Sequence, residues 1–250
     1  MAKKKNQKKK QQPSQQNQKK QQSNLPAILF FSISGIAIIG FLIFLMINST
    51  GSNNQGTASQ TEPLEFNATL EGQPSLGDEN APITIVEIGD YKCIHCKDFH
   101  QNIFSKLKKD FIDTGKVQFY FVNFPFIDED SARLARGGET VFAQNPEAFW
   151  EYHNLVFEQE YKDGELWATE EAIVKLVEDK LPAVDAKKFK QEFEDNAYVS
   201  KVNEDLSIVK ETGVTSTPTV FINGKEFQQW YDYEAFKAEL ERLLKDSEGK

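Results

Sequence analysis

The two cysteines of this chain lie in one short segment, Cys93-Ile94-His95-Cys96. The segment before them, residues 83–89, is rich in β-branched side chains and is bounded by turn residues, which predicts a buried strand. After them, apolar residues recur every three or four positions up to Phe111, which predicts a helix with one face on a core. The pair therefore marks a strand-to-helix junction, with Cys93 at the helix start and Cys96 on the buried face.

A cysteine at a helix start differs chemically from one in a core. The first N–H groups of a helix have no partner within it and carry partial positive charge, so they stabilise a thiolate. We therefore expect the pKa of Cys93 to lie below that of a free thiol. His95 can add a positive charge or a hydrogen bond to the same sulfur, and Lys92 is a third positive group, expected in solvent. The pattern predicts a redox dithiol in which Cys93 attacks and Cys96 resolves.

A close cysteine pair also has two other interpretations, a structural disulfide and part of a metal site. A metal site needs further ligands, and the chain has only three histidines and no second cysteine pair. A bridge over so short a loop would stabilise the fold by only about 2 kcal/mol. We therefore favour redox chemistry and expect neither a metal nor a cofactor. Of the other histidines, His100 and His153 are expected to be packing or surface residues.

The first 47 residues have the composition of a membrane anchor. Residues 1–24 contain eight lysines and no acidic residue, which predicts a disordered tail. Residues 25–47 carry no charge and are long enough for a transmembrane helix. Because this run is too long for a cleavable signal peptide and lacks a small-residue cleavage site, we expect an uncleaved signal-anchor. Lysines on one flank only predict a cytoplasmic tail and an extracytoplasmic remainder.

The remainder begins with a linker and is strongly acidic. Residues 48–65 are rich in Gly, Ser, Asn and Gln, which predicts a flexible linker. Outside the tail the chain has 21 basic and 38 acidic residues, a formal net charge of −17, which argues against nucleic acid as a partner. Disulfides persist outside the cytoplasm. A single close cysteine pair there indicates chemistry rather than stabilisation.

The outer domain, residues 66–250, opens with strands. A first edge strand is expected at 66–70, and residues 117–124 predict a second long strand after the cysteine helix. The helix is expected to end near Thr114-Gly115, with glycine as a left-handed cap. A strand, helix and strand of this length form a βαβ unit, so strands 83–89 and 117–124 are expected to be parallel neighbours.

The second half of the domain is helical before it returns to strands. The pattern from about 126 to 213 is helical throughout, which exceeds one crossover and predicts an inserted helical subdomain. Residues 214–222 then predict a strand, and Asn223-Gly224 is a strong hairpin signal that joins it to residues 225–228. A closing helix is expected from about Asp232.

This order of elements resembles the thioredoxin fold with a helical insertion. More narrowly, the chain is similar to the membrane-anchored DsbA-like thiol–disulfide oxidoreductases of Gram-positive bacteria. The resemblance covers about residues 65–245 and rests on segment 81–93 (APITIVEIGDYKC), the insertion and Thr217-Pro218. It implies an α/β, thioredoxin-like domain with an inserted helical subdomain, preceded by a single transmembrane helix.

The resemblance also implies roles for individual residues. Cys93 matches the family's nucleophile and Cys96 its resolving cysteine. His95 matches the histidine that favours the thiolate, and Thr217-Pro218 matches the cis-proline loop that holds the substrate chain. Glu87 matches the acidic residue beneath the active site that assists proton transfer to or from the buried sulfur; an ordinary sheet carboxylate is the alternative for it.

The function expected from this resemblance is an oxidase that introduces disulfides into exported proteins. Its partners would be unfolded or reduced exported proteins and a quinone-linked membrane protein that reoxidises the dithiol. Many members carry proline where this chain has Ile94, so the resemblance does not imply a reduction potential. One alternative is thus an extracytoplasmic reductase or isomerase. A second, from a different class, is a non-catalytic peptide-binding chaperone module on a thioredoxin scaffold.

Overall fold

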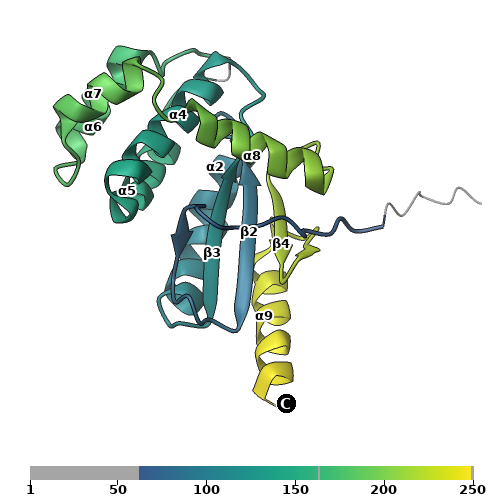
Figure 1. Cartoon of the computed structure of the whole chain (residues 1–250). Helices are drawn as coiled ribbons and strands as arrows, with labels where there is room; N and C mark the ends of the chain where they lie inside the picture. The colour runs from purple at the N-terminus through teal and green to yellow at the C-terminus, as the bar shows by residue number, and fades with distance from the viewer. Residues whose placement is uncertain (1–61, 163, 249–250) are drawn as a thin grey trace, which may run out of the picture. The chain divides into compact units, whose positions relative to one another are not determined.

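The structure is a computed structural model that describes residues 62–162 and 164–248 (Figure 1). The predicted tail, the predicted transmembrane segment and residues 48–61 of the linker lie outside the described residues. Within the described part of the chain, no helix is both long and apolar enough to cross a bilayer.

A five-stranded mixed sheet forms the centre of the domain, in the order β1-β3-β2-β4-β5. Strand β2 (Ile83–Gly89) pairs in parallel with β3 (Val117–Asn123) and antiparallel with β4 (Thr219–Ile222). Two short strands, β1 (Ser75–Leu76) and β5 (Lys225–Glu226), lie at the edges. The strand that leads into the cysteines is therefore the central one, and the predicted parallel pair is confirmed.

The edge strand expected at 66–70 is wrong. Glu65 makes a single bridge to Lys225, and the strand that pairs with β3 is β1 instead. The side chain of Phe66 is buried against Phe221, with ring centroids 5.3 Å apart. The apolar alternation of this segment therefore serves packing on the sheet and not strand pairing.

The helix after the cysteines runs as predicted, although part of it is π-helical. It comprises α2 (Ile94–Phe99), η1 (His100–Phe104), α3 (Ser105–Leu107) and η2 (Lys108–Ile112). The predicted apolar stripe is buried along its whole length: Cys96, Phe99, Ile103, Leu107 and Phe111. Gly115 ends the segment with φ of 72°, the left-handed conformation expected of a helix cap.

The insertion is helical, as predicted, and its described residues form five helices. They are α4 (Glu129–Gln144), α5 (Pro146–Glu158), α6 (Glu170–Lys180), α7 (Ala186–Glu194) and α8 (Val199–Thr212). The first four begin at a side chain that accepts backbone N–H groups of the first turn: Asp128, Asn145, Thr169 and Asp185. In Figure 1 these helices gather at one end of the sheet, beside the start of α2.

Strand β4 is shorter than expected, because residues 214–218 form a loop. The Thr217–Pro218 peptide bond in this loop is cis. The hairpin signal is confirmed, since Asn223 and Gly224 join β4 to β5 with φ of 48° and 80°. Helix α9 (Tyr233–Glu248) follows, with the carboxylate of Asp232 accepting from the first N–H groups.

Both faces of β2 are covered, which explains why its sequence is almost continuously apolar. Val86 and Ile88 belong to the core cluster that includes residues of α8, whereas Ile83 and Ile85 belong to the cluster that contains the cysteines. Because side chains alternate along a strand, Glu87 lies on the cysteine face with Ile83 and Ile85. The carboxyl group of Glu87 is thereby placed in the core under the motif.

Candidate active site

Cys93 is the N-cap residue of α2, with φ of −74° and ψ of 119°. Its N–H donates to the carbonyl oxygen of Asp90 at 3.0 Å, and its own carbonyl accepts from the N–H of Lys97 at 3.0 Å. The side chain therefore occupies the place where capping side chains usually accept the first N–H groups of a helix. A sulfur at this position is suited to carry negative charge.

The pKa of Cys93 is lowered to about 6. The largest cause is a hydrogen bond from the Cys96 thiol, which burial opposes. Thr217 and the backbone N–H groups of Cys96 and His95 also stabilise the thiolate. This direction agrees with the expectation from the helix start. At neutral pH, Cys93 of the reduced protein is mainly a thiolate.

Cys96 has the opposite character. Its side chain is fully buried, and burial raises its pKa well above that of a free thiol, with further contributions from the hydrogen bond to Cys93 and the charge of Glu87. The two thiols, three residues apart in the chain, thus differ in protonation at neutral pH. One is poised to attack or leave, and the other holds its proton.

The cis-proline loop lies against the nucleophile. The Cys93 thiol donates to the carbonyl oxygen of Thr217 at 3.3 Å, across 124 residues of sequence. Pro218 is buried, and the hydroxyl of Thr217 is buried without a partner among the described residues. The structure therefore brings Thr217-Pro218 to the dithiol, as the family resemblance implies.

Glu87 lies beneath the dithiol on β2 and is 1% exposed. Burial, and then the charge of Cys93, raise its pKa well above the usual range for a carboxyl group. Its Oε1 has no hydrogen-bond partner within the described residues. A buried carboxyl group with a raised pKa that is electrostatically coupled to both sulfurs can exchange a proton with the inner one.

His95 is exposed and faces a surface cavity. Its ring lies 6.0 Å from that of Trp230 and, with Phe99 and Tyr231, lines a cavity of about 480 Å³. The backbone N–H of His95, rather than its ring, is among the main groups that lower the pKa of Cys93. The imidazole is thus exposed at the surface, on the wall of this cavity.

Comparison with known proteins agrees with this geometry. Residues 69–242 match the family model described as thioredoxin. The probable disulfide bond formation protein D of Bacillus anthracis is 33% identical over 216 residues, which cover 86% of this chain and 94% of that protein. Disulfide bond formation protein D of Bacillus subtilis is 33% identical over 192 residues, covering 77% of this chain and 86% of that protein.

The chain belongs to the DsbA-like thiol–disulfide oxidoreductases of the thioredoxin family. The crystal structure of oxidised BdbD from Bacillus subtilis superimposes on it with a TM-score of 0.69 at 33% identity, over 74% of this chain and 99% of that one. The thioredoxin-like fold with a helical insertion, expected from the sequence, is thereby confirmed.

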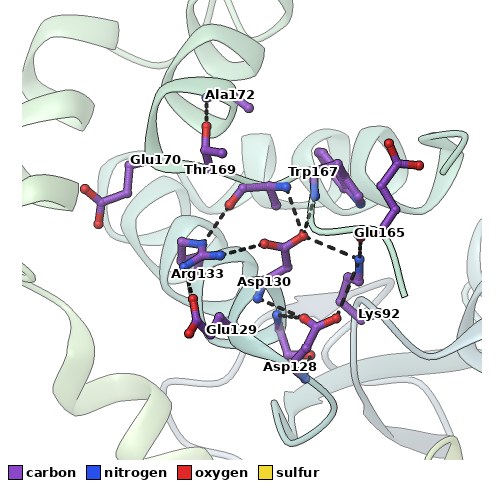
Figure 2. A network of polar contacts seen from close by, with 12 residues as sticks. Lys92, Asp128, Glu129, Asp130, Arg133, Glu165, Trp167, Thr169, Glu170 and Ala172 are labelled. Carbon is purple, nitrogen blue, oxygen red and sulfur yellow. Dashed lines mark hydrogen bonds and ion pairs between the residues drawn. The ribbon is translucent and has the colours of Figure 1, made fainter. Parts of the chain in front are cut away.

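Lys92 of this oxidoreductase is not where the sequence places it. Its side chain, expected in solvent, is 2% exposed, and its ammonium group pairs with Asp128 and Asp130 at the start of α4 (Figure 2). The long aliphatic stem of a lysine tolerates burial where its ammonium finds carboxylates. Lys92 is also absent from the main groups that lower the pKa of Cys93.

Asp90 is a site residue that the sequence analysis missed. Its buried carboxylate accepts from the N–H of Lys92 at 2.8 Å, of Phe126 at 2.9 Å and of Ile127 at 3.1 Å. Asp90 therefore joins the end of β2 to the start of the helical insertion. Its place directly after a strand and before the motif was the available signal, since aspartate there commonly binds backbone N–H groups.

The two remaining histidines are buried, as expected of packing residues. The Tyr91 hydroxyl lies 3.1 Å from Nδ1 of His153, which ties the end of β2 to α5. Burial lowers the pKa of His100 to about 4 and that of His153 well below its usual value, so both imidazoles are neutral at physiological pH.

Proposed function

We propose that this oxidoreductase is a membrane-tethered oxidase that introduces disulfides into exported proteins. The observation that carries the proposal is the unequal pKa of the two thiols, about 6 for Cys93 and well above a free thiol for Cys96. A stabilised Cys93 thiolate favours the reduced enzyme, and this preference drives the oxidation of a client protein.

The reaction we propose has two exchange steps. A client thiolate attacks Sγ of Cys93 in the oxidised enzyme, which breaks the Cys93–Cys96 bond and releases the sulfur of Cys96. Cys96 takes up a proton, for which the buried carboxyl group of Glu87 is the nearby donor. A second client thiolate then attacks the client sulfur of the mixed disulfide and displaces the Cys93 thiolate. The client loses two electrons, and the enzyme gains them.

The client chain would bind on the side of the dithiol that faces Thr217-Pro218. The backbone next to a cis-proline offers hydrogen-bonding groups to an extended chain, and the cavity beside His95 and Trp230 offers an apolar surface for a side chain next to the client cysteine. A mostly apolar hollow with a few polar groups is typical of a binding site.

The location we propose rests on the sequence of the N-terminal region. Residues 25–47 would anchor the chain, with residues 1–24 in the cytoplasm and the catalytic domain outside. Two relatives carry the name disulfide bond formation protein, which fits a role in the maturation of exported proteins. A quinone-linked membrane protein would accept the electrons and restore the disulfide.

The experiment that tests the oxidase proposal is the redox equilibrium of the purified full-length protein in glutathione buffers. We expect a reduction potential well above that of thioredoxin, which is about −270 mV. A potential at or below that value would contradict the oxidase and support an extracytoplasmic reductase. Activity that survives Cys93→Ser would contradict dithiol chemistry altogether and support the peptide-binding chaperone alternative.

A further inference from the structure

Lys92 directly precedes the nucleophile, yet its ammonium group is buried in the helical insertion. Its Nζ lies 3.4 Å from Oδ2 of Asp130 and 3.7 Å from Oδ2 of Asp128. It also donates to the carbonyl oxygen of Glu165 (Figure 2). Two carboxylates and one carbonyl, all from the insertion, therefore hold the ammonium group of the residue next to Cys93.

Asp130 is the centre of this polar network. Its side chain is fully buried and accepts from the N–H groups of Trp167 at 2.7 Å and Ala168 at 3.0 Å, and from Nη2 of Arg133 at 2.8 Å. Figure 2 shows the carboxylate between Arg133 on one side and the ammonium group of Lys92 on the other. A single carboxylate thus joins the cysteine motif, helix α4 and the residues that lead into α6.

A second lysine, Lys97, holds the same part of the insertion from the other side of the motif. Its Nζ donates to the carbonyl oxygen of Gln159 at 2.6 Å. The ring of Tyr161 lies 4.4 Å from Nζ of Lys92 and 5.2 Å from Nζ of Lys97, both within the range of cation–π attraction. The lysines that flank the two cysteines therefore fix the chain between α5 and α6 at two points.

The charge of Lys92 is largely compensated where it lies. A buried ammonium group paired with two carboxylates contributes little net positive potential at a sulfur outside the pair. The groups that act most on the Cys93 thiolate are the Cys96 thiol, Thr217 and the first N–H groups of α2. What Lys92 supplies to Cys93 is therefore a fixed position of the chain that leads into the helix.

We propose that Lys92 is a positioning residue for Cys93, and that its ion pair with Asp130 holds the nucleophile over the N–H groups at the start of α2. The inference rests on the proposed function, because it requires Cys93 to react as a thiolate. Loss of the ion pair frees the chain before Cys93, so its thiolate loses part of its hydrogen bonding and its pKa rises.

The test compares the pH dependence of Cys93 alkylation by iodoacetamide in the reduced full-length protein, Lys92→Met and Asp130→Asn. Methionine keeps the length of the buried stem, and asparagine keeps the shape and one acceptor oxygen of the carboxylate. If Lys92 positions Cys93, both variants raise its pKa, by about one unit, which is about a tenfold loss of thiolate at low pH. If Lys92 acted through its charge, the two variants would shift the pKa in opposite directions, since Lys92→Met removes the positive charge and Asp130→Asn removes one of the two carboxylates that offset it.

The controls separate position from general stability. Lys175→Met breaks an exposed ion pair with Asp179, 2.7 Å long, and should leave the Cys93 profile unchanged. A lowered pKa in Asp130→Asn would overturn the proposal, as would an unchanged pKa in folded Asp130→Asn whose free energy of unfolding has fallen. Because Asp130→Asn alone separates these outcomes, the test stands even where Lys92→Met fails to fold.

The wild-type profile tests the proposed function separately. An ordinary thiol pKa for Cys93 in the wild type would overturn the proposed function itself, and this is seen before any variant is compared.

Discussion

The Cys93 thiol lies 3.3 Å from the carbonyl oxygen of Thr217, the residue whose peptide bond to Pro218 is cis. A carbonyl oxygen can only accept a hydrogen bond, and the sulfur of Cys93 can donate one only while it is protonated. This hydrogen bond is therefore lost when Cys93 ionises. The buried, unpartnered hydroxyl of Thr217 is then the group on that residue that can donate to the thiolate. One residue of the loop thus serves both protonation states of the nucleophile.

Removal of that hydroxyl should make Cys93 a weaker acid. In Thr217→Val the thiolate loses one donor while the backbone carbonyl stays, so we expect the pKa of Cys93 to rise by about half a unit to one unit. The measurement is the pH dependence of thiolate absorbance at 240 nm, read against a Cys93→Ser blank, in the reduced protein. Thr215→Val, an exposed neighbour in the same loop, is the matched control and should titrate like the wild type. An unchanged pKa in Thr217→Val would contradict a donor role.

Cys96 should lower the pKa of Cys93 through its S–H group, the largest of the causes. Because the pKa of Cys93 is about 6, the alkylation rate of the wild type should rise with pH and reach half its plateau near pH 6. Cys96→Ala removes the donor and should move this midpoint up by at least one unit. Cys96→Ser keeps an O–H donor and should shift it less. Equal shifts in the two variants would show that the S–H hydrogen bond is not the cause.

Sequence reasoning worked best where one local pattern carries the structure. The β-branched run before the motif, the apolar stripe up to Phe111 and the Asn223-Gly224 turn each depend on neighbouring residues only, and each was predicted correctly. The expected strand at 66–70 failed because alternating apolar residues look the same whether they pair with a strand or pack on a sheet. Whether the segment pairs or packs depends on β1 and on Phe221, which lie elsewhere in the chain.

Prediction of the site from the sequence has the same limit: it succeeds for local patterns and fails for contacts between distant residues. The spacing of Cys93 and Cys96 identifies the dithiol, the helix start predicts the lowered pKa of Cys93, and the apolar stripe predicts the burial of Cys96. Lys92 is expected in solvent because a lysine side chain is buried only where its ammonium group pairs with a counterion. That counterion, Asp130, lies 38 residues away, and nothing local to either residue indicates the pair.

Glu87 should make the protein less stable as the pH rises. Burial, and then the charge of Cys93, raise its folded-state pKa well above the 4.5 of a free glutamate side chain, so its contribution to stability is fully present below pH 4.5 and is lost as the pH rises through the folded-state pKa. Glu87→Gln does not titrate, so its free energy of unfolding relative to the wild type should increase between pH 4.5 and pH 8. Urea denaturation of the oxidised proteins at both pH values measures this. Glu151→Gln, at an exposed position on α5, is the control and should show no such trend.

Gly137 in α4 should resist replacement by alanine despite its place in a helix. A Cβ there would lie 2.4 Å from the hydroxyl oxygen of Tyr152, which donates to the carbonyl of Leu134. The usual gain of about 1 kcal/mol for alanine in a helix should be outweighed, for a net loss of about 1–3 kcal/mol from overpacking. Gly138→Ala, whose Cβ would meet Phe149 at 3.2 Å, should cost less. In a Tyr152→Phe background the cost of Gly137→Ala should shrink, and an unchanged cost would rule out the hydroxyl as the obstacle.

Trp230 should affect client binding and leave the chemistry of Cys93 intact. Its ring lies 6.0 Å from that of His95 on the cavity of about 480 Å³ beside the motif, but it is not among the main groups that lower the pKa of Cys93. For Trp230→Ala we expect the KM for a reduced peptide with an apolar residue beside its cysteine to rise about tenfold, the equivalent of about 1.4 kcal/mol of binding. The kcat and the pH midpoint of Cys93 alkylation should stay at their wild-type values. Val199→Ala, which truncates an exposed apolar side chain on α8, is the control for the general effect of removing exposed apolar surface. A lowered kcat with an unchanged KM would mean that Trp230 acts through His95 on the motif. That result would contradict the assignment of the cavity as the binding site of the client side chain.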